Sequence, residues 1–437
     1  MGHKATITVL GGLLALGCGG ELERDDAGLG DHGSGGGIQL DGSDGSDGSG
    51  GGLKLDFGDG DGPSPGAGDC QPGADEDFSY IWVSNSDEGS VSKIDTKTGA
   101  ELGRYWAGPA EADGDPSRTS VNLEGDVVVS VRDPGGITKI AAQPSGCVDA
   151  NGNGQIETST GADDILDWGR DECVLWHTVI PSAKQYNGPR PTAWDARTVV
   201  DPDGGCSMGA ARVWVGYLHE DGHGVFWRLD GETGEVLDTV DGPQYESRPY
   251  GGAVDARGNF WVTGWQHDSA LRIDGETLEI TDFGNPGVEL YGMTLDADGH
   301  LWVADRSSTG AVAHLDPEDG SWSVIPEVGG KTRGIQIDRD GQAWLAGNNP
   351  CRLVQVDIAT ETVVDEAIEL PGCGDPVGIS IDADGFVWVV DRQSDRAYKV
   401  DPHSHEVQLT VEGLVGPYTY SDMTGSGLNL VTNPPVG

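Results

Sequence analysis

One short segment, residues 149–157, places oxygen-bearing side chains at alternate positions along the chain. A tight loop with this spacing directs its oxygen atoms to one side, and hard cations such as Ca²⁺ are bound by oxygen ligands. Gly154 permits the sharp turn that such a loop needs, and Ile156 is expected to pack the loop onto its neighbour. The sequence therefore predicts a structural calcium site whose ligands come from Asp149, Asn151, Asn153 and Gln155.

The pattern Asp-x-Asn-x-Asn-Gly-x-Ile resembles the first positions of EF-hand and dockerin-type calcium loops. This resemblance implies an acidic ligand at the twelfth position, where the chain has Thr160 instead. Asp163 or Asp164 follows just downstream and could close the site, and we assign Asp164. The alternative is an ordinary turn-rich loop, because Asn-Gly pairs are frequent in turns. Cys147 and Cys173 lie on either side of the segment, as expected of an insertion whose ends are joined by a disulfide.

A repeated pattern runs through the chain: a short apolar strand, Asp-x-x-Gly, then an aromatic residue or a Trp-Val pair. Its centres are Trp82, Val128, Trp214, Trp261, Trp302, Trp344 and Trp388. Successive centres are 46, 86, 47, 41, 42 and 44 residues apart, and the interval of 86 equals one repeat plus an insertion. Alternating strands between Gly/Asp turns indicate antiparallel hairpins. About seven repeats of four short strands predict an all-β propeller, in which the Asp-x-x-Gly turns are structural.

These repeats resemble those of streptogramin B (virginiamycin B) lyase-like propellers and the related NHL and YVTN-type repeats. The resemblance covers about residues 76–430 and rests on Gly-x-x-Trp-Val in successive strands. It indicates an architecture and is weak evidence for an activity. The first copy, residues 78–83, lacks an innermost strand, and residues 417–423 can supply one. We therefore expect the ring to close between the two ends of the domain, which removes an exposed sheet edge.

Residues just before the innermost strand of each blade surround the axis of a propeller. At this register the repeats carry mostly arginine and tyrosine: Arg118, Arg190, Arg248, Tyr250, Tyr291, Lys331, Arg333, Val377 and Tyr418. Guanidinium groups suit carboxylates or phosphates, and tyrosine offers a flat face with a polar tip. We predict that all of these except Lys331 and Val377 bind a small anionic ligand at the mouth of the channel. The alternative is a structural role, in which the arginines pair with Glu246, Glu289 or Asp375.

The resemblance to streptogramin B lyases implies histidines at this register, together with magnesium. The matching positions hold Tyr250, Tyr291, Arg333 and Val377, so the general base that a carbon–oxygen elimination needs is missing there. Three other histidines fall in loops after a second strand and are expected at the surface: His219, His223 and His267. We therefore favour a non-catalytic ligand- or protein-binding module. A streptogramin B lyase-like carbon–oxygen lyase that uses other residues is the alternative.

The N-terminus has the order of a secretory signal: Lys4, an apolar run of twelve residues, then small residues before Cys18. The run is too short to span a bilayer as a helix. Ala15-Leu16-Gly17-Cys18 resembles the lipobox of bacterial lipoproteins, which implies a signal peptide at 1–17 and a lipid on Cys18. Gly19 resembles the residue found in lipoproteins sent to the outer membrane. We expect a cell-envelope protein on the outer membrane, periplasmic or surface-exposed.

Composition divides the remainder of the chain at about residue 75. Residues 18–75 are rich in Gly, Asp and Ser, with thirteen acids and two bases after Cys18, which predicts a disordered tether. The full chain carries −47, and about −37 remains without this tether and Lys4. Such a charge disfavours nucleic acid as a partner, and it disfavours membranes except through the lipid. Residues 76–437 should form a monomeric propeller with an insertion at about 144–186, whose partner is a small anion or another envelope protein.

Six cysteines remain after Cys18, an even number that suggests three disulfides in an exported protein. Nearness in sequence favours Cys147–Cys173 and Cys351–Cys373, which would leave Cys70 with Cys206. Six cysteines allow fifteen connectivities, and the spacing alone does not choose among them.

Overall fold

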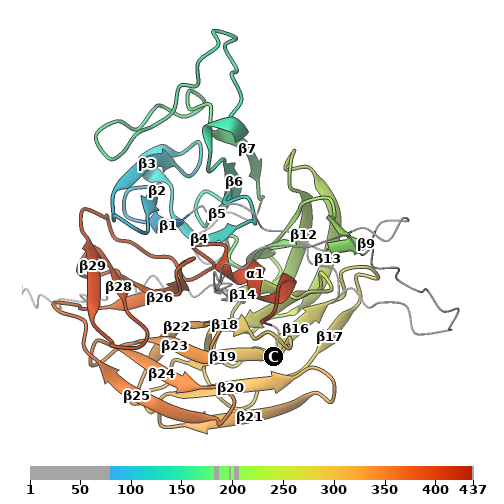
Figure 1. Ribbon diagram of the computed structural model, residues 1–437. Coiled ribbons are helices and arrows are strands. Elements are labelled where there is room, and N and C mark those ends of the chain that lie inside the picture. Colours follow the sequence, from blue (N-terminus) through green and yellow to red (C-terminus); the bar gives the residue numbers. More distant parts are fainter. Residues whose placement is uncertain (1–78, 182–186, 196–197, 201–205, 436–437) are drawn as a thin grey trace, which may run out of the picture.

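Seven β-sheets are arranged as the blades of a propeller around a central axis (Figure 1). The computed structural model describes residues 79–181, 187–195, 198–200 and 206–435. The prediction of an all-β propeller of about seven four-stranded blades is confirmed, and the number of blades is seven. The predicted signal sequence, Cys18, the predicted tether and Cys70 lie outside the described residues.

Blades 4 to 7 each consist of four consecutive antiparallel strands, and the first strands of neighbouring blades adjoin around the axis. In blade 4 these are β14 (Pro249–Val254), β15 (Phe260–Gly264), β16 (Ala270–Ile273) and β17 (Ile280–Asp282). In blade 5 they are β18 (Leu290–Leu295), β19 (Leu301–Asp305), β20 (Ala311–Asp316) and β21 (Ser321–Pro326). In blade 6 they are β22 (Thr332–Ile337), β23 (Gln342–Gly347), β24 (Arg352–Asp357) and β25 (Thr362–Ile368). In blade 7 they are β26 (Pro376–Ile381), β27 (Val387–Asp391), β28 (Arg396–Val400) and β29 (Val407–Val411).

Blade 1 is built from both ends of the domain. Its own strands are β1 (Tyr80–Asn85), β2 (Ser90–Asp95) and β3 (Glu101–Trp106). Residues 417–423 take the innermost position, where the N–H of Tyr418 donates to the carbonyl oxygen of Ser84 (2.9 Å). The N–H of Trp82 likewise donates to the carbonyl oxygen of Met423 (2.8 Å). The C-terminal segment therefore completes the first blade, as the repeats predicted.

Blade 2 carries an insertion between its third and fourth strands. Its strands are β4 (Pro116–Val121), β5 (Val127–Val131), β6 (Gly136–Ile140) and β7 (Val174–Val179). Two short 3-10 helices lie nearby, at Glu111–Asp113 and Pro144–Gly146. Residues 141–173 project from the blade (Figure 1), and the predicted disulfide Cys147–Cys173 joins the ends of this projection. The range predicted for the insertion, 144–186, includes β7, which pairs with β6 inside the blade.

Blade 3 contains a second excursion, between its first and second strands. Its strands are β8 (Thr192–Asp195), β11 (Arg212–Leu218), β12 (His223–Asp230) and β13 (Val236–Gln244). The excursion holds a hairpin of β9 (Thr198–Val200) and β10 (Cys206–Met208). We expected one insertion in the long interval between Val128 and Trp214, whereas the structure divides the extra length between two blades.

The repeated Asp-x-x-Gly and tryptophan positions form one structural unit in each of the later blades. In blade 5, Asp296 Oδ1 accepts the N–H groups of Asp298 and His300, and this closes the turn between β18 and β19. Asp296 Oδ2 accepts the indole N–H of Trp302 at 2.8 Å. The equivalent indole–carboxylate bonds are Trp261–Asp255, Trp344–Asp338 and Trp388–Asp382. The repeat therefore encodes a buried tryptophan whose only polar atom is satisfied by the turn before it.

A C-terminal segment closes the axis at the end where the innermost strands finish. The helix α1 (Ser426–Thr432) lies near the centre of the ring in Figure 1, after the turn at residues 422–425. The hydroxyl of Thr424 donates to the carbonyl oxygen of Ile381, at the end of β26 (2.6 Å). Leu428 is buried in the core shared by blades 2 and 3. The C-terminal segment therefore covers this end of the axis.

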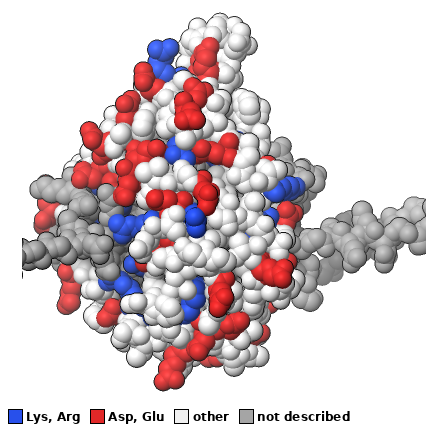
Figure 2. Space-filling view, turned by 90° about the vertical axis from the view of Figure 1, so that its left-hand side faces the viewer, with Lys and Arg blue, Asp and Glu red and all other residues white. Residues whose placement is uncertain are grey.

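Acidic side chains are distributed over the side of the molecule shown in Figure 2, and basic side chains are fewer there. This agrees with the charge of −47 on the full chain. Within the described ranges, no helix is both long enough and apolar enough to cross a membrane.

Candidate ligand-binding site

The residues predicted to surround the axis come together in the structure. Arg118, Tyr250, Tyr291 and Arg333 lie in the innermost strands β4, β14, β18 and β22. Arg190 lies two residues before β8, Arg248 immediately precedes β14, and Tyr418 lies in the segment that closes blade 1. We expected these side chains at the channel mouth, yet all except Arg248 are at most 4% exposed. They fill the interior because seven innermost strands converge on a narrow axis.

Aromatic rings form the centre of this cluster. Tyr250 and Tyr291 have ring centroids 5.4 Å apart, and Tyr291 is 5.5 Å from Tyr420. The hydroxyls of Tyr291 and Tyr420 share a hydrogen bond of 2.7 Å. Burial raises the pKa of Tyr250, Tyr418 and Tyr420 well above the usual value, so these phenols stay uncharged. The hydroxyls of Tyr250 and Tyr418 are buried and find no hydrogen-bond partner among the described residues.

Guanidinium groups lie over these rings. Arg118 lies 5.3 Å from the centroid of Tyr250 and 5.5 Å from that of Tyr420. Arg190 also lies over Tyr250, at 5.9 Å. Cation–π contacts of this kind offset part of the cost of removing a guanidinium from water. Burial lowers the pKa of Arg118 to about 10, and the charge of Arg190 acts in the same direction, so Arg118 remains protonated at neutral pH.

Three further arginines join the cluster from a register that the sequence analysis did not consider. Arg132, Arg306 and Arg392 each follow the second strand of a blade. Arg132 and Arg392 lie over Tyr418 at 5.1 and 5.3 Å, and Arg306 lies 4.9 Å from the ring of Trp265. Asp305-Arg306 and Asp391-Arg392 occupy equivalent places after the Trp-Val pair. Alignment of the repeats at this second position could have found them. Trp265 was missed for the same reason, whereas Tyr420 lies two residues after Tyr418 in the innermost segment of blade 1.

Two of the arginines form ion pairs with carboxylates near the axis. Arg132 pairs with Asp115. Arg333 Nη2 lies 3.2 Å from Asp375 Oδ1, and its Nη1 donates to the hydroxyl of Tyr420 (3.2 Å). The structural alternative therefore holds for Arg333. The backbone N–H groups of Glu246 and Glu289, the other acids named in that alternative, donate to Asp268 and Asp305.

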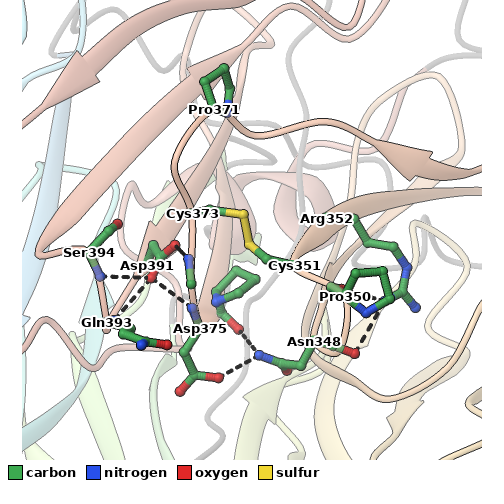
Figure 3. Close-up of a disulfide and its surroundings, with 12 residues drawn as sticks. Asn348, Pro350, Cys351, Arg352, Pro371, Cys373, Asp375, Asp391, Gln393 and Ser394 are labelled. Carbon is green, nitrogen blue, oxygen red and sulfur yellow. Dashed lines mark hydrogen bonds between the residues drawn. A yellow bond between two sulfur atoms is a disulfide. The ribbon is translucent and has the colours of Figure 1, made fainter.

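The Cys351–Cys373 disulfide, which was also predicted, lies near Asp375, the acid of this ion pair (Figure 3). It joins the loop after β23 to the segment that leads into β26. Asn348 Nδ2 donates to Asp375 Oδ1 at 2.6 Å, and Asp391 accepts the N–H groups of Gly374 and Asp375. The disulfide and these hydrogen bonds hold the carboxylate that faces Arg333.

The predicted calcium loop is ordered by its own hydrogen bonds. Asp149 Oδ1 accepts the N–H of Gly152 (2.7 Å), and Asp149 Oδ2 accepts that of Gly154 (2.8 Å). The side-chain amides of Asn151 and Asn153 both donate to the carboxylate of Glu157. Glu157 therefore joins the predicted ligands, and it occupies the ninth position of the loop, where EF-hand loops also place a ligand.

The acid assigned to close the calcium loop makes a different contact. Asp164 Oδ2 accepts a hydrogen bond from Thr160 Oγ1 (2.8 Å), within a turn of its own. The carboxylate that reaches the loop from outside is that of Glu172, which accepts the N–H groups of Ala150 and Glu157 at 2.9 Å each. Glu172 was not considered because it lies 15 residues after Glu157 in sequence. The donor set is made of oxygen atoms throughout, which fits a hard cation.

Comparison with solved structures finds the same fold in proteins of very different sequence. A streptogramin B lyase matches with a TM-score of 0.51 and 16% identity over 72% of this chain and 88% of the other. A protein of unknown function from Desulfotomaculum acetoxidans matches with a TM-score of 0.53 and 13% identity over 78% and 99%. A catalytically inactive virginiamycin B lyase from Staphylococcus aureus, with quinupristin, gives 0.50 and 15% over 72% and 89%.

No protein-family model matches the chain, and no curated protein matches it. The structural matches establish a streptogramin B lyase-like, seven-bladed propeller fold, and at these identities they establish the fold alone.

Proposed function

We propose that this propeller is a non-catalytic binding module that takes a small anionic ligand at the end of the axis where the innermost strands begin. The observation that carries the proposal is the cluster of buried guanidinium groups among uncharged tyrosines. At its outer edge Arg248, Arg306 and Arg392 remain partly exposed, which gives an anion from solvent its first contacts.

The chemistry of the cluster favours an anion with a flat body. A desolvated guanidinium interacts more strongly with a carboxylate or phosphate than it would in water. Tyr250 and Tyr418 each offer a buried hydroxyl that can donate to the ligand. The surrounding rings provide contact area for an aromatic or sugar-like group. The strongly acidic remainder of the chain makes this basic interior a local site for anions.

A lyase reaction is the alternative, and the residues at the axis do not favour it. The elimination needs a general base. Burial raises the pKa of Tyr250, Tyr418 and Tyr420, so these phenols stay protonated. The carboxylates of Asp115 and Asp375 are held in ion pairs with Arg132 and Arg333. His219 and His267 lie in exposed or partly exposed loops after the second strands of blades 3 and 4. Incubation with a streptogramin B substrate is expected to give no ring-opened product by mass spectrometry, and turnover would refute the non-catalytic assignment.

Binding can be tested by calorimetry with inorganic phosphate and with 4-hydroxybenzoate as probes. Replacing Arg248 and Arg333 together by Gln should weaken binding by about 10- to 100-fold, as expected for the loss of charge-assisted hydrogen bonds. Arg257→Gln is the matched control, because Arg257 is exposed in the turn at the other end of β14. Equal loss in both variants, or no binding of either probe by the unmodified protein, would contradict the proposal.

We also propose that the propeller is attached to the outer membrane through a lipid on Cys18 and extended from it by the tether. The support is the lipobox-like sequence followed by the Gly/Asp/Ser segment. Cys18→Ala should abolish fatty-acid labelling and move the protein from the membrane to the soluble fraction. Labelling that persists in this variant would contradict the anchor.

We further propose that the insertion binds one structural calcium ion, with Glu157 in place of Asp164 as the closing carboxylate. Calcium should raise the thermal midpoint, because a ligand that binds only the folded state stabilises that state. The Asp149→Ala, Asn151→Ala double variant and Glu157→Gln should lose this rise. Asp164→Ala is the control and should keep it. A midpoint that does not respond to calcium or to chelator would leave the loop an ordinary turn.

A further inference from the structure

The hairpin that joins β11 to β12 brings two histidines and an aspartate together. The N–H of His219 donates to the carbonyl oxygen of His223 at 2.8 Å across the turn. Residues that face each other in an antiparallel pair project to the same side. The two imidazole rings accordingly lie side by side, with centroids 4.7 Å apart. Asp221, at the tip of the turn, directs its carboxylate toward both of them.

The nitrogen atoms of both rings face one carboxylate oxygen. His219 Nδ1 lies 3.0 Å from Asp221 Oδ1, and His223 Nδ1 contacts the same oxygen. One ligand atom from each of the three residues lies within 4.8 Å of the other two. An ion with bonds of about 2.0–2.1 Å can bridge atoms at this separation after small side-chain rotations. Imidazole nitrogen with carboxylate oxygen is a donor set for zinc and similar divalent ions.

A second carboxylate lies on the outer side of this cluster. Asp241, on β13, has its Oδ1 3.6 Å from Nε2 of His223, the nitrogen that does not face Asp221. A carboxylate at the far nitrogen of a metal-binding histidine favours the tautomer whose near nitrogen is free to bind the metal. Gly222, with φ of +93°, permits the tight turn, and its carbonyl oxygen accepts the N–H of Tyr245 (3.0 Å). The backbone therefore holds the three side chains in place.

We propose that His219, Asp221 and His223 bind one divalent transition-metal ion of the zinc class, with Asp241 as a positioning residue. The site is separate from the axial cluster and from the all-oxygen calcium loop. Three protein ligands leave at least one coordination position for solvent or for a ligand from a partner. The side chains of His219, Asp221 and His223 are 47%, 60% and 21% exposed, so the open coordination position lies at the surface. His219 lies exposed in a loop, as the sequence predicted, whereas His223 is the first residue of β12 and is only 21% exposed. The hairpin makes the two histidines a pair.

The test is titration of the full chain, without a histidine tag, with Zn²⁺ in metal-free buffer, followed by calorimetry. One ion per chain is expected. The His219→Ala, His223→Ala double variant should bind at least 100-fold more weakly, and Asp241→Asn about tenfold more weakly. The His267→Ala, His403→Ala variant removes two exposed histidines outside the cluster and should bind as the unmodified protein does.

Co²⁺ supplies a second measurement that does not depend on stability. Its visible absorption should appear on binding to the unmodified protein and be absent from the His219→Ala, His223→Ala variant. The absence of saturable Zn²⁺ binding would overturn the proposal. Unchanged binding in that variant, or loss of binding in an Asp149→Ala, Asn151→Ala variant of the calcium loop, would also overturn it.

Discussion

The buried ion pair between Asp382 and Lys399 allows a quantitative test of how blade 7 is held to blade 1. Lys399 Nζ lies 2.8 Å from Asp382 Oδ2, and the two side chains are 8% and 1% exposed. The same ammonium donates to the carbonyl oxygen of Thr96, in blade 1 (2.9 Å). Lys399→Met keeps the apolar stem but leaves a buried carboxylate without its cation.

The expected cost follows from the contacts that Asp382 keeps. Removing one partner of a buried pair costs about 3–5 kcal/mol. In Lys399→Met, Asp382 retains the N–H groups of Asp384 and Phe386 and the indole N–H of Trp388. We therefore expect about 3 kcal/mol, at the lower end of that range. Adding Asp382→Asn removes the uncompensated charge, but its amide NH2 then faces the indole N–H of Trp388, which loses its acceptor. The total loss should therefore fall only to about 2 kcal/mol, within the range for a buried donor left unsatisfied.

The assay is urea denaturation of the full chain, with the free energy of unfolding measured for each member of the double-mutant cycle. Glu412→Gln is the matched control, because it breaks the ion pair between Glu412 and Arg396. Arg396 lies on β28, the strand that also carries Lys399, and the side chains of Arg396 and Glu412 are 35% and 67% exposed. Exposed pairs often contribute nothing measurable, so its urea midpoint should not move. If Lys399→Met unfolds at the same urea concentration as Glu412→Gln, or if Asp382→Asn fails to restore stability, the reasoning is wrong.

Three further outcomes are expected. Burial raises the pKa of Asp422 to about 7, so the protonated carboxyl contributes its full stability below pH 4, and this contribution is lost as the pH rises through 7. In a pH series of urea midpoints, Asp422→Asn should remove this decline. Burial lowers the pKa of His177 to about 4, so the neutral imidazole contributes its full stability above pH 6.5, and this contribution is lost as the pH falls toward 4. His177 packs edge-on against Trp168 of the insertion, so hydrogen exchange of the insertion should accelerate between pH 6.5 and 4. The His177→Gln variant should not show this acceleration. Replacing Cys147 and Cys173 by Ser should cost about 3 kcal/mol, because the bond closes a loop with a separation of 26 residues, and an unchanged urea midpoint would contradict this.

Local rules were enough to predict most of the architecture. The Asp-x-x-Gly turn and the tryptophan after it interact within a few residues, as Asp296 and Trp302 show, so every repeat carries its own folding information. The completion of the first blade by residues 417–423 also followed from counting strands. The nearest-neighbour disulfides were predicted correctly because short loops between cysteines favour pairing.

Contacts between residues far apart in sequence decided the candidate sites. Repeat alignment predicted that Arg118, Arg190 and Arg333 share one level of the axis. It could not predict that they are buried, since burial depends on how seven blades fill the space between them. Glu172, next to Cys173, contacts the predicted calcium loop where the Cys147–Cys173 bond joins the ends of the insertion. His219 and His223 become a pair only when the hairpin forms. The sequence by itself determined the blades, because blade structure is local and repeated. The tertiary structure alone decided which charged groups meet and which lose their water, because both depend on closing the ring.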